Sequence, residues 1–239
     1  HHRSVKGINL ITLYATDQNG QNIPINFRIY DKSEGKTKND YFMDMLSEVL
    51  SWGAKIQFIT GDSWYSSTGN LKTIRKYGIR FMFGIDCNRK VSPEKGQWFQ
   101  LRLLPDFHQG QVVWLKDFGF VQLFKTQLKE QQRFYIVYQD EDDLLSFEGF
   151  HELHSSHWKI EQYHRVIKQV CHIEKFQVRR SKLILNHIFS ALMAYVEIQK
   201  NQFERIFENV YRWQKKLFRP VIKNFIDDFI LDKNHLLPQ

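Results

Sequence analysis

The chain has 239 residues, of which 42% are hydrophobic and 15% aromatic, and its formal net charge at pH 7 is +8. This length and composition predict one sizeable globular core and exclude an intrinsically disordered chain. The positive charge favours polyanionic partners such as nucleic acid. No apolar run approaches the length of a membrane span, so no membrane association is expected. The two cysteines, Cys87 and Cys171, lack metal or redox spacing and indicate reduced thiols in a cytoplasmic protein.

The first fifth of the chain predicts a β-hairpin followed by a helix. Residues 5–16 and 23–30 are strand-like and flank an Asn-Gly turn, which supplies the positive φ that hairpins need. Thr37 and Asp40 have the spacing of a capping box, and apolar residues then recur at a helical period. Gly53 follows as the expected C′ residue of that helix.

A strand, a helix and a second strand are predicted next, over residues 56–60, 69–77 and 79–84. Short links between such elements predict a parallel pair of strands with a right-handed crossover. Asp62 follows the first strand directly. It would therefore lie at the carboxyl end of that strand, where open α/β sheets bind their ligands.

The second half predicts an antiparallel β insertion and then helices. The predicted elements are strands at 97–104, 111–116, 120–126 and 133–138, an apolar core helix at 183–199, a basic helix at 203–218 that ends before Pro220, and a short helix at 221–231. The domain interpretation is an α/β core in two parts, 1–87 and 144–200, interrupted by the β insertion at 88–143 and followed by a helical segment at 201–239.

A predicted helix from His154 to His172 carries the most unusual polar face. At about 100° per residue, apolar residues such as Tyr163 and Ile167 fall on one side. The opposite stripe holds a single carboxylate, Glu161, among imidazoles, a guanidinium and an ammonium; its members are His154, His157, Glu161, His164, Arg165, Lys168 and His172. One acid among cations suits a site that holds a divalent metal beside a phosphate group. Mg²⁺ needs only a few carboxylates plus substrate phosphate, so Asp62 and Glu161 are the candidate ligands.

Several blocks in a consistent order resemble insertion-sequence DDE transposases, a family with an RNase H-like core and a β insertion. The segment "VKGINLITLYATDQNGQNIPINFRIYDK" resembles the second and third core strands, and "GKTKND" and "FQVRR" also fit. Asp62 in "ITGDSWYSS" resembles the second acid of that family, and Glu161 in "HSSHWKIEQYHRVIK" the third. Lys168 matches the spacing of the family lysine. His154 and His157 occupy the positions of its Tyr and Arg.

The resemblance implies an RNase H-like mixed sheet flanked by helices, and DNA strand cleavage and strand transfer by in-line phosphoryl transfer with Mg²⁺ or Mn²⁺. Asp62 and Glu161 would be catalytic and bind the metal, and His157, Arg165 and Lys168 would bind the phosphates of DNA. The implied partners are double-stranded DNA at transposon ends and target sites, and a second copy of the chain on that DNA. The implied location is cytoplasmic, at the bacterial nucleoid.

The family's first Asp lies on a core strand that would precede residue 5, so the chain resembles the C-terminal part of a transposase. We therefore expect that residues 1–239 alone neither cut nor join DNA. Two other functions stay open: a non-catalytic DNA-binding remnant, and a structure-specific nuclease on the same fold. The enzymatic alternatives require the carboxyls of Asp62 and Glu161 to lie within reach of a shared metal ion.

Structural explanations also stay open for individual residues. Asp62 could shape a turn, and Glu161 could pair with Arg165 one helical turn later. Trp64 and Tyr65 could contact DNA bases or belong to the core. Four histidines, without a recognised zinc spacing, could instead form a zinc site; they are His151, His154, His157 and His164.

Overall fold

The computed structural model describes residues 7–17, 19–128, 131–139 and 144–235. Three predicted features fall partly outside these residues: the start of the first strand at Val5 and Lys6, the end of the β insertion at 140–143, and the last residues of the C-terminal segment at 236–239.

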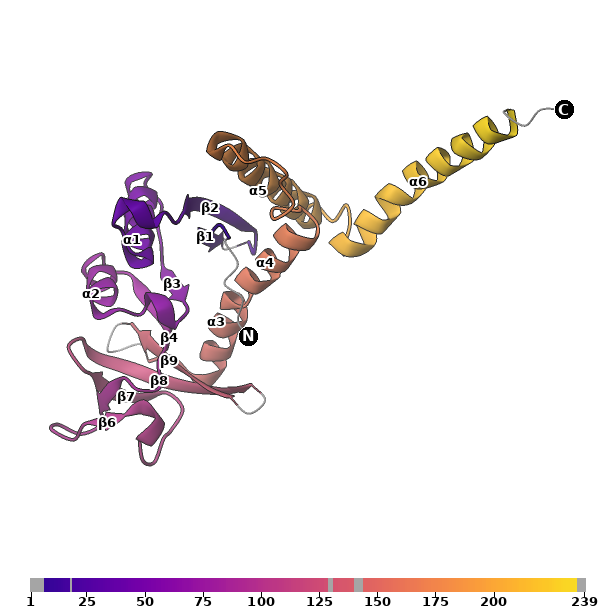
Figure 1. The fold of residues 1–239 in the computed structure, drawn as a ribbon. Helices are drawn as coiled ribbons and strands as arrows, with labels where there is room; N and C mark the ends of the chain where they lie inside the picture. The colour runs from indigo at the N-terminus through magenta and orange to yellow at the C-terminus, as the bar shows by residue number, and fades with distance from the viewer. Residues whose placement is uncertain (1–6, 18, 129–130, 140–143, 236–239) are drawn as a thin grey trace, which may run out of the picture. The chain divides into compact units, whose positions relative to one another are not determined.

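The described residues form nine strands, six α-helices and three short 3₁₀ helices, and Figure 1 draws them as a ribbon. In chain order they are β1 (Leu10–Thr16), β2 (Asn22–Ile29), η1 (Lys32–Glu34), α1 (Lys38–Ser51), β3 (Phe58–Gly61), η2 (Ser63–Tyr65), α2 (Thr68–Lys76), β4 (Arg80–Ile85), β5 (Lys90–Ser92), β6 (Phe99–Gln100), η3 (Leu101–Leu103), β7 (Gln111–Leu115), β8 (Gly119–Leu128), β9 (Gln131–Tyr138), α3 (Phe147–His157), α4 (Lys159–Gln169), α5 (Ser181–Phe203) and α6 (Val210–His235). None of the described helices combines the length and the hydropathy needed to cross a membrane.

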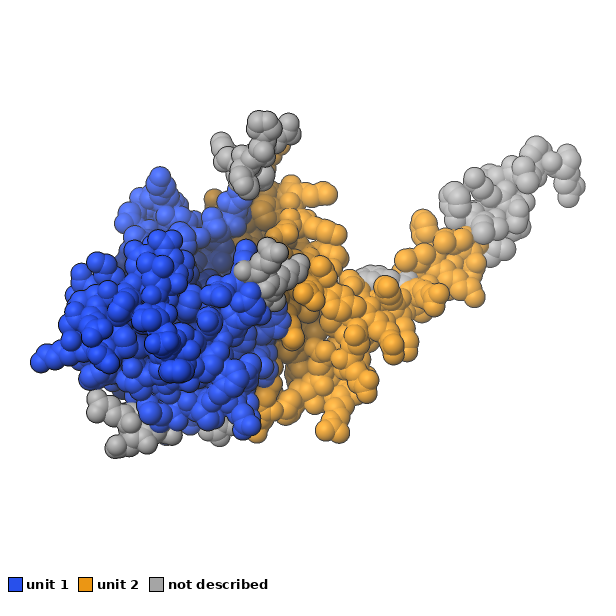
Figure 2. All heavy atoms as spheres, turned by 90° about the horizontal axis from the view of Figure 1, so that it is seen from below, with its two compact units in different colours: residues 1–14, 25–159 blue, residues 15–24, 160–239 orange. Residues whose placement is uncertain are grey.

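The chain forms two compact units, which Figure 2 colours separately. Unit 1 comprises residues 1–14 and 25–159, and unit 2 comprises residues 15–24 and 160–239. The boundary in the second half of the chain therefore falls one residue after α4 begins.

Helix α1 begins and ends where the sequence predicts. Thr37 and Asp40 form the complete capping box, with each side chain accepting a hydrogen bond from the backbone of the other. Gly53 has a φ of 82°, a conformation that glycine adopts without the steric penalty of a Cβ. Five side chains of the helix are buried: Tyr41, Phe42, Met45, Leu46 and Val49.

Seven strands form one mixed sheet in the order β3-β4-β9-β8-β7-β5-β6. β3 and β4 are parallel, as predicted for the strand–helix–strand segment. β9 pairs antiparallel with β4, so the strands of the predicted insertion continue the sheet that β3 and β4 begin. The α/β core and the predicted insertion thus share one set of hydrogen-bonded strands.

Alternate residues along a strand of the sheet belong to two different hydrophobic clusters, because successive side chains of a strand point to opposite faces. Phe81 and Phe83 of β4 join a cluster with residues of α1 and α2. Met82, between them, joins a second cluster with Phe124 of β8 and Phe150 of α3. Helices therefore cover both faces, α1 and α2 on one and α3 on the other.

The predicted hairpin forms a two-stranded sheet of its own. Ile11 of β1 packs in a small cluster with Tyr41 and Met45 of α1. Asn26 and Arg28 of β2 both donate hydrogen bonds to the carboxylate of Glu48 in the same helix. Side-chain contacts with α1, within unit 1, thus hold the hairpin in place.

One predicted strand and two predicted helices differ from the structure in this part of the chain. The strand expected at 97–104 is only β6, because the N–H groups of Leu101 and Arg102 bond to the carbonyls of Arg89 and Cys87 and the chain turns into η3. The two helices expected at 203–218 and 221–231 are a single helix, α6, which begins only at Val210, whereas Phe203 is the last residue of α5. Proline removes one hydrogen-bond donor from a helix. Helix α6 nevertheless continues on both sides of Pro220, despite this missing hydrogen bond.

We expect Phe150→Ala to destabilise unit 1 strongly. Phe150 is fully buried, and its ring stacks on that of Phe124 with ring centroids 4.3 Å apart and an interplanar angle of 2°. Truncation of a buried Phe lowers the free energy of unfolding by about 3–5 kcal/mol. The matched control is Phe147→Ala in the same helix, since Phe147 is 45% exposed and its loss should cost about 1 kcal/mol or less. Urea unfolding measures both, and equal losses would contradict the packing of α3 on the sheet.

Candidate functional site

Asp62 lies directly after β3, at the carboxyl end of the strand, as the sequence predicts. Its backbone approaches β4 closely, because Gly61 has no side chain: a Cβ there would lie 2.5 Å from Cε1 of Phe83. The Asp62 side chain caps the 3₁₀ turn η2, and its Oδ1 accepts the N–H of Trp64 at 3.0 Å. Asp62 is nevertheless exposed. Asp62 therefore does shape the turn, and this hydrogen bond uses one lone pair of its Oδ1.

The two aromatic residues after Asp62 have different environments. Tyr65 packs on Phe42 with ring centroids 5.2 Å apart, and burial, together with the charge of Asp62, raises its pKa to about 12. Trp64 is 62% exposed. The ammonium of Lys38, the first residue of α1, lies 5.1 Å from the centroid of the Trp64 ring. The sequence analysis did not select Lys38; the available signal was the capping box of Thr37 and Asp40, which encloses it.

The helix predicted from His154 to His172 is divided. α3 ends at His157, Trp158 forms a turn, and α4 runs from Lys159 to Gln169. Ser155 and Ser156 and the two residues that follow them are poor helix formers, which favours a break at this point. His172 lies beyond α4 with a φ of 56°. The predicted polar stripe is therefore not one continuous helical face.

The apolar side predicted for this segment is present in α4. Tyr163 and Ile167 are buried. Within unit 2, the ring of Tyr163 meets that of Tyr195 in α5 edge to face, with centroids 4.9 Å apart. The amphipathic character of α4 follows from the sequence as expected.

Two histidines near the end of α3 contact the strands beneath them. The Nε2 of His154 lies 3.0 Å from the hydroxyl of Tyr135 in β9. The Nδ1 of His157 lies 3.1 Å from Oγ1 of Thr60 in β3. Thr60 precedes Asp62 by two residues, so the structure brings His157 to the strand end that carries the candidate acid.

Glu161, Arg165 and Lys168 are exposed residues of α4. The ammonium of Lys168 forms an ion pair with Glu174, with Nζ and Oε1 2.8 Å apart. Asp62 belongs to unit 1 and Glu161 to unit 2, so the distance between their carboxyls stays a prediction.

The exposed carboxylate of Asp62 offers the oxygen donors that a hard cation prefers. No group of three or more His, Cys, Asp or Glu side chains in the described part of the chain could hold a metal ion. Mg²⁺ commonly binds through one or two carboxylates plus substrate phosphates, so a single exposed acid such as Asp62 fits its donor set. The zinc alternative has less support, because His154 and His157 already direct ring nitrogens at Tyr135 and Thr60.

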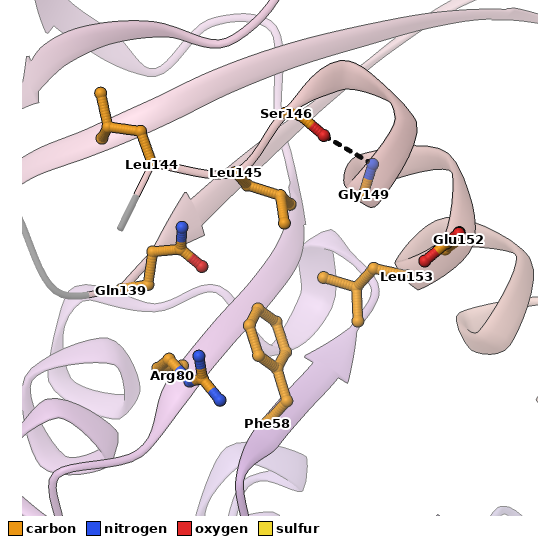
Figure 3. Close-up of a pocket in the computed structure, with 9 residues that line it drawn as sticks. All are labelled: Phe58, Arg80, Gln139, Leu144, Leu145, Ser146, Gly149, Glu152 and Leu153. Carbon is orange, nitrogen blue, oxygen red and sulfur yellow. Dashed lines mark hydrogen bonds between the residues drawn. The ribbon is translucent and has the colours of Figure 1, made fainter. Parts of the chain in front are cut away.

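A separate hollow of about 490 Å³ lies on the α3 face of the sheet (Figure 3). Phe58 and Arg80, the first residues of β3 and β4, form one wall, and Leu145 and Leu153 form another. Asp62 follows the last residue of β3, so this hollow lies at the opposite end of the strand from the candidate acid.

The pH dependence of stability should report the environment of His154. Burial, together with the charges of His157, His151 and Arg133, holds the pKa of His154 below its ordinary value of 6.5. The unfolded chain therefore binds more protons just below pH 6.5, and stability falls as the pH falls through that range. We expect His154→Gln to reduce this loss, measured by urea unfolding at pH 7 and pH 5. The exposed His108→Gln is the control, and an equal effect of both variants would contradict the assignment.

Comparison with known families places these residues in a wider context. A family model described as "Transposase DDE domain" matches residues 1–196, a span that includes Asp62 and all of α4. A comparison with curated proteins finds no match.

Proposed function

Because this chain belongs to the transposase DDE domain family, we propose that it carries catalytic residues of an insertion-sequence DNA transposase. Its reaction is the cleavage of DNA strands at transposon ends, followed by attack of a 3′-OH on target DNA. Both steps are in-line phosphoryl transfers. The proposed cofactor is Mg²⁺ or Mn²⁺, the proposed partners are double-stranded DNA and a second copy of the chain, and the proposed location is the bacterial nucleoid.

The position of Asp62 is the observation that carries the proposal. Its exposed carboxylate follows the first strand of a parallel pair, at the edge where α/β sheets bind ligands. The segment that leads to Glu161 is tied to the same place through His157 and Thr60. Glu161 follows His157 by four residues, a length of chain that spans at most about 14 Å. This connectivity supports a shared role for the two acids.

The proposed roles follow from charge and position. The carboxylates of Asp62 and Glu161 would hold the divalent ion, which when bound would supply activation of an attacking water and stabilisation of the leaving oxygen. Arg165 and Lys168 would bind phosphate oxygens and orient the scissile phosphate for in-line attack. His157, held at Thr60, would position the chain ahead of Glu161 and contribute to the binding of a DNA phosphate.

Two acids are fewer than the three that the family uses, so we expect residues 1–239 by themselves neither to nick nor to join DNA. The alternative functions, a DNA-binding remnant and a structure-specific nuclease, differ in their need for the acids. Binding to DNA alone requires only cations and gives a salt-dependent affinity. A nuclease requires Asp62 and Glu161 to share a metal ion.

Iron-directed backbone cleavage tests the shared site without requiring DNA turnover. Fe²⁺ bound in place of Mg²⁺ generates hydroxyl radicals with ascorbate and peroxide, and these cut the chain near the metal. We expect cuts around both Asp62 and Glu161, suppressed by excess Mg²⁺. Asp62→Asn and Glu161→Gln should each abolish both sets, whereas Glu152→Gln, an exposed acid of α3, should not.

Cuts at only one acid would show that the two do not share an ion. Nicking of a plasmid in the same Mg²⁺ buffer provides the second measurement. Turnover by residues 1–239 that disappears in Glu161→Gln would overturn the expectation that this chain is inactive alone.

The ion pair between Lys168 and Glu174 should compete with DNA. The pair is exposed, so it contributes only about 0–1 kcal/mol. We expect Glu174→Gln to tighten DNA binding, because it releases the ammonium and removes a negative charge. Lys168→Gln should weaken binding and lower the slope of log affinity against log salt by about 1. Fluorescence anisotropy across a salt series measures both. Weaker binding by Glu174→Gln would exclude Lys168 as a phosphate contact.

A further inference from the structure

We infer that Trp64 and Lys38 form a contact site for an unpaired DNA base and its phosphate, beside Asp62. The inference rests on the proposed function, because it assigns a substrate contact to the same strand end. Its evidence is the exposure of Trp64, the Lys38 ammonium beside its ring, and the hydrogen bond that joins the backbone of Trp64 to Asp62.

Trp64 is held in place by its backbone while its ring stays in solvent. Its N–H donates to Oδ1 of Asp62 at 3.0 Å, and it lies within η2. Gly84 of β4 supports this turn, because a Cβ there would lie 3.0 Å from the backbone N of Ser63. A 62% exposed indole on such a well-fixed turn, beside the half-buried Tyr65, is available for a partner.

Lys38 adds a cation at the face of that ring. Its Nζ lies 5.1 Å from the ring centroid of Trp64 and 5.9 Å from that of Tyr30. Lys38 is the first residue of α1, where the positive end of the helix dipole disfavours a cation. Helix stability therefore does not explain a lysine at this position. A phosphate group bound there would neutralise the ammonium and also lie near the positive end of the helix.

Stacking on an indole selects an unpaired base. Bases within a duplex already stack on their neighbours, so an aromatic side chain reaches a base face only where the strand is single or a base is extruded. Together, the Trp64 ring and the Lys38 ammonium would bind one base and the phosphate attached to it. Asp62, two residues away, would then face the adjoining part of the same strand.

Binding of residues 1–239 to two fluorescein-labelled probes tests the site. One probe is a 30-base-pair duplex and the other is the same duplex with a central three-nucleotide single-stranded gap, both in EDTA. We expect Trp64→Ala to weaken binding to the gapped probe at least about fivefold, as expected for loss of aromatic–base stacking, and to leave duplex binding within twofold. Trp64→Phe should retain most of the affinity. Lys38→Gln should weaken binding to both probes and lower the salt slope by about 1.

Trp52→Ala is the matched control. Trp52 is 59% exposed and lies at the other end of α1, which is about 20 Å long. Unchanged binding of the gapped probe by Trp64→Ala, or an equal loss in Trp52→Ala, would overturn the inference. This assay contains no metal, so it tests the base contact independently of the metal site. A missing gap preference would overturn the base contact and leave the iron-directed cuts at Asp62 and Glu161 unaffected. Missing cuts would overturn the shared metal site and leave the gap preference unaffected.

Discussion

The contact between Gly61 and Phe83 is the constraint on which the candidate site depends. Phe83 is a fully buried residue of β4, and its ring occupies the space that a side chain at residue 61 would need. The end of β3 can therefore lie against β4 in parallel pairing, and the next residue, Asp62, leaves the strand at the edge of the sheet. The same hydrophobic cluster anchors α1 and α2, so the core and the acid share one support.

The opposite face of the sheet contributes a second element through α3. Phe150 stacks on Phe124 and fixes this helix over β8 and β9. Farther along the helix, His157 meets Thr60 of β3. Helices on the two faces of the sheet thus contribute residues at β3 and at the turn that follows it: α1 supplies Lys38 beside Trp64 of η2, and α3 supplies His157 at Thr60 of β3. The proposed chemistry and the proposed base contact therefore share the segment from Thr60 to Trp64.

Electrostatics connects the site to its expected substrate. The net charge of +8 favours association with DNA in general, and individual cations determine where the strand would bind. Lys38 is directed toward an aromatic ring, whereas Lys168 is paired with Glu174. The first cation already lies at the ring of Trp64, two residues after Asp62 in the chain. The second must exchange a weak carboxylate partner for phosphate, which makes its contribution to binding sensitive to a single neighbouring charge.

The sequence by itself determined the elements whose signals are local. Four features follow from residues within a few positions of one another. They are the capping box at Thr37 and Asp40, the glycine after α1, the parallel strands around α2, and the position of Asp62. The tertiary structure alone decided that β9 pairs with β4, that Tyr65 is packed while Trp64 is exposed, and that His154 meets Tyr135. Those outcomes depend on partners far away in the chain, such as Phe42 for Tyr65 and Tyr135 for His154, and a periodicity within one segment contains no information about them.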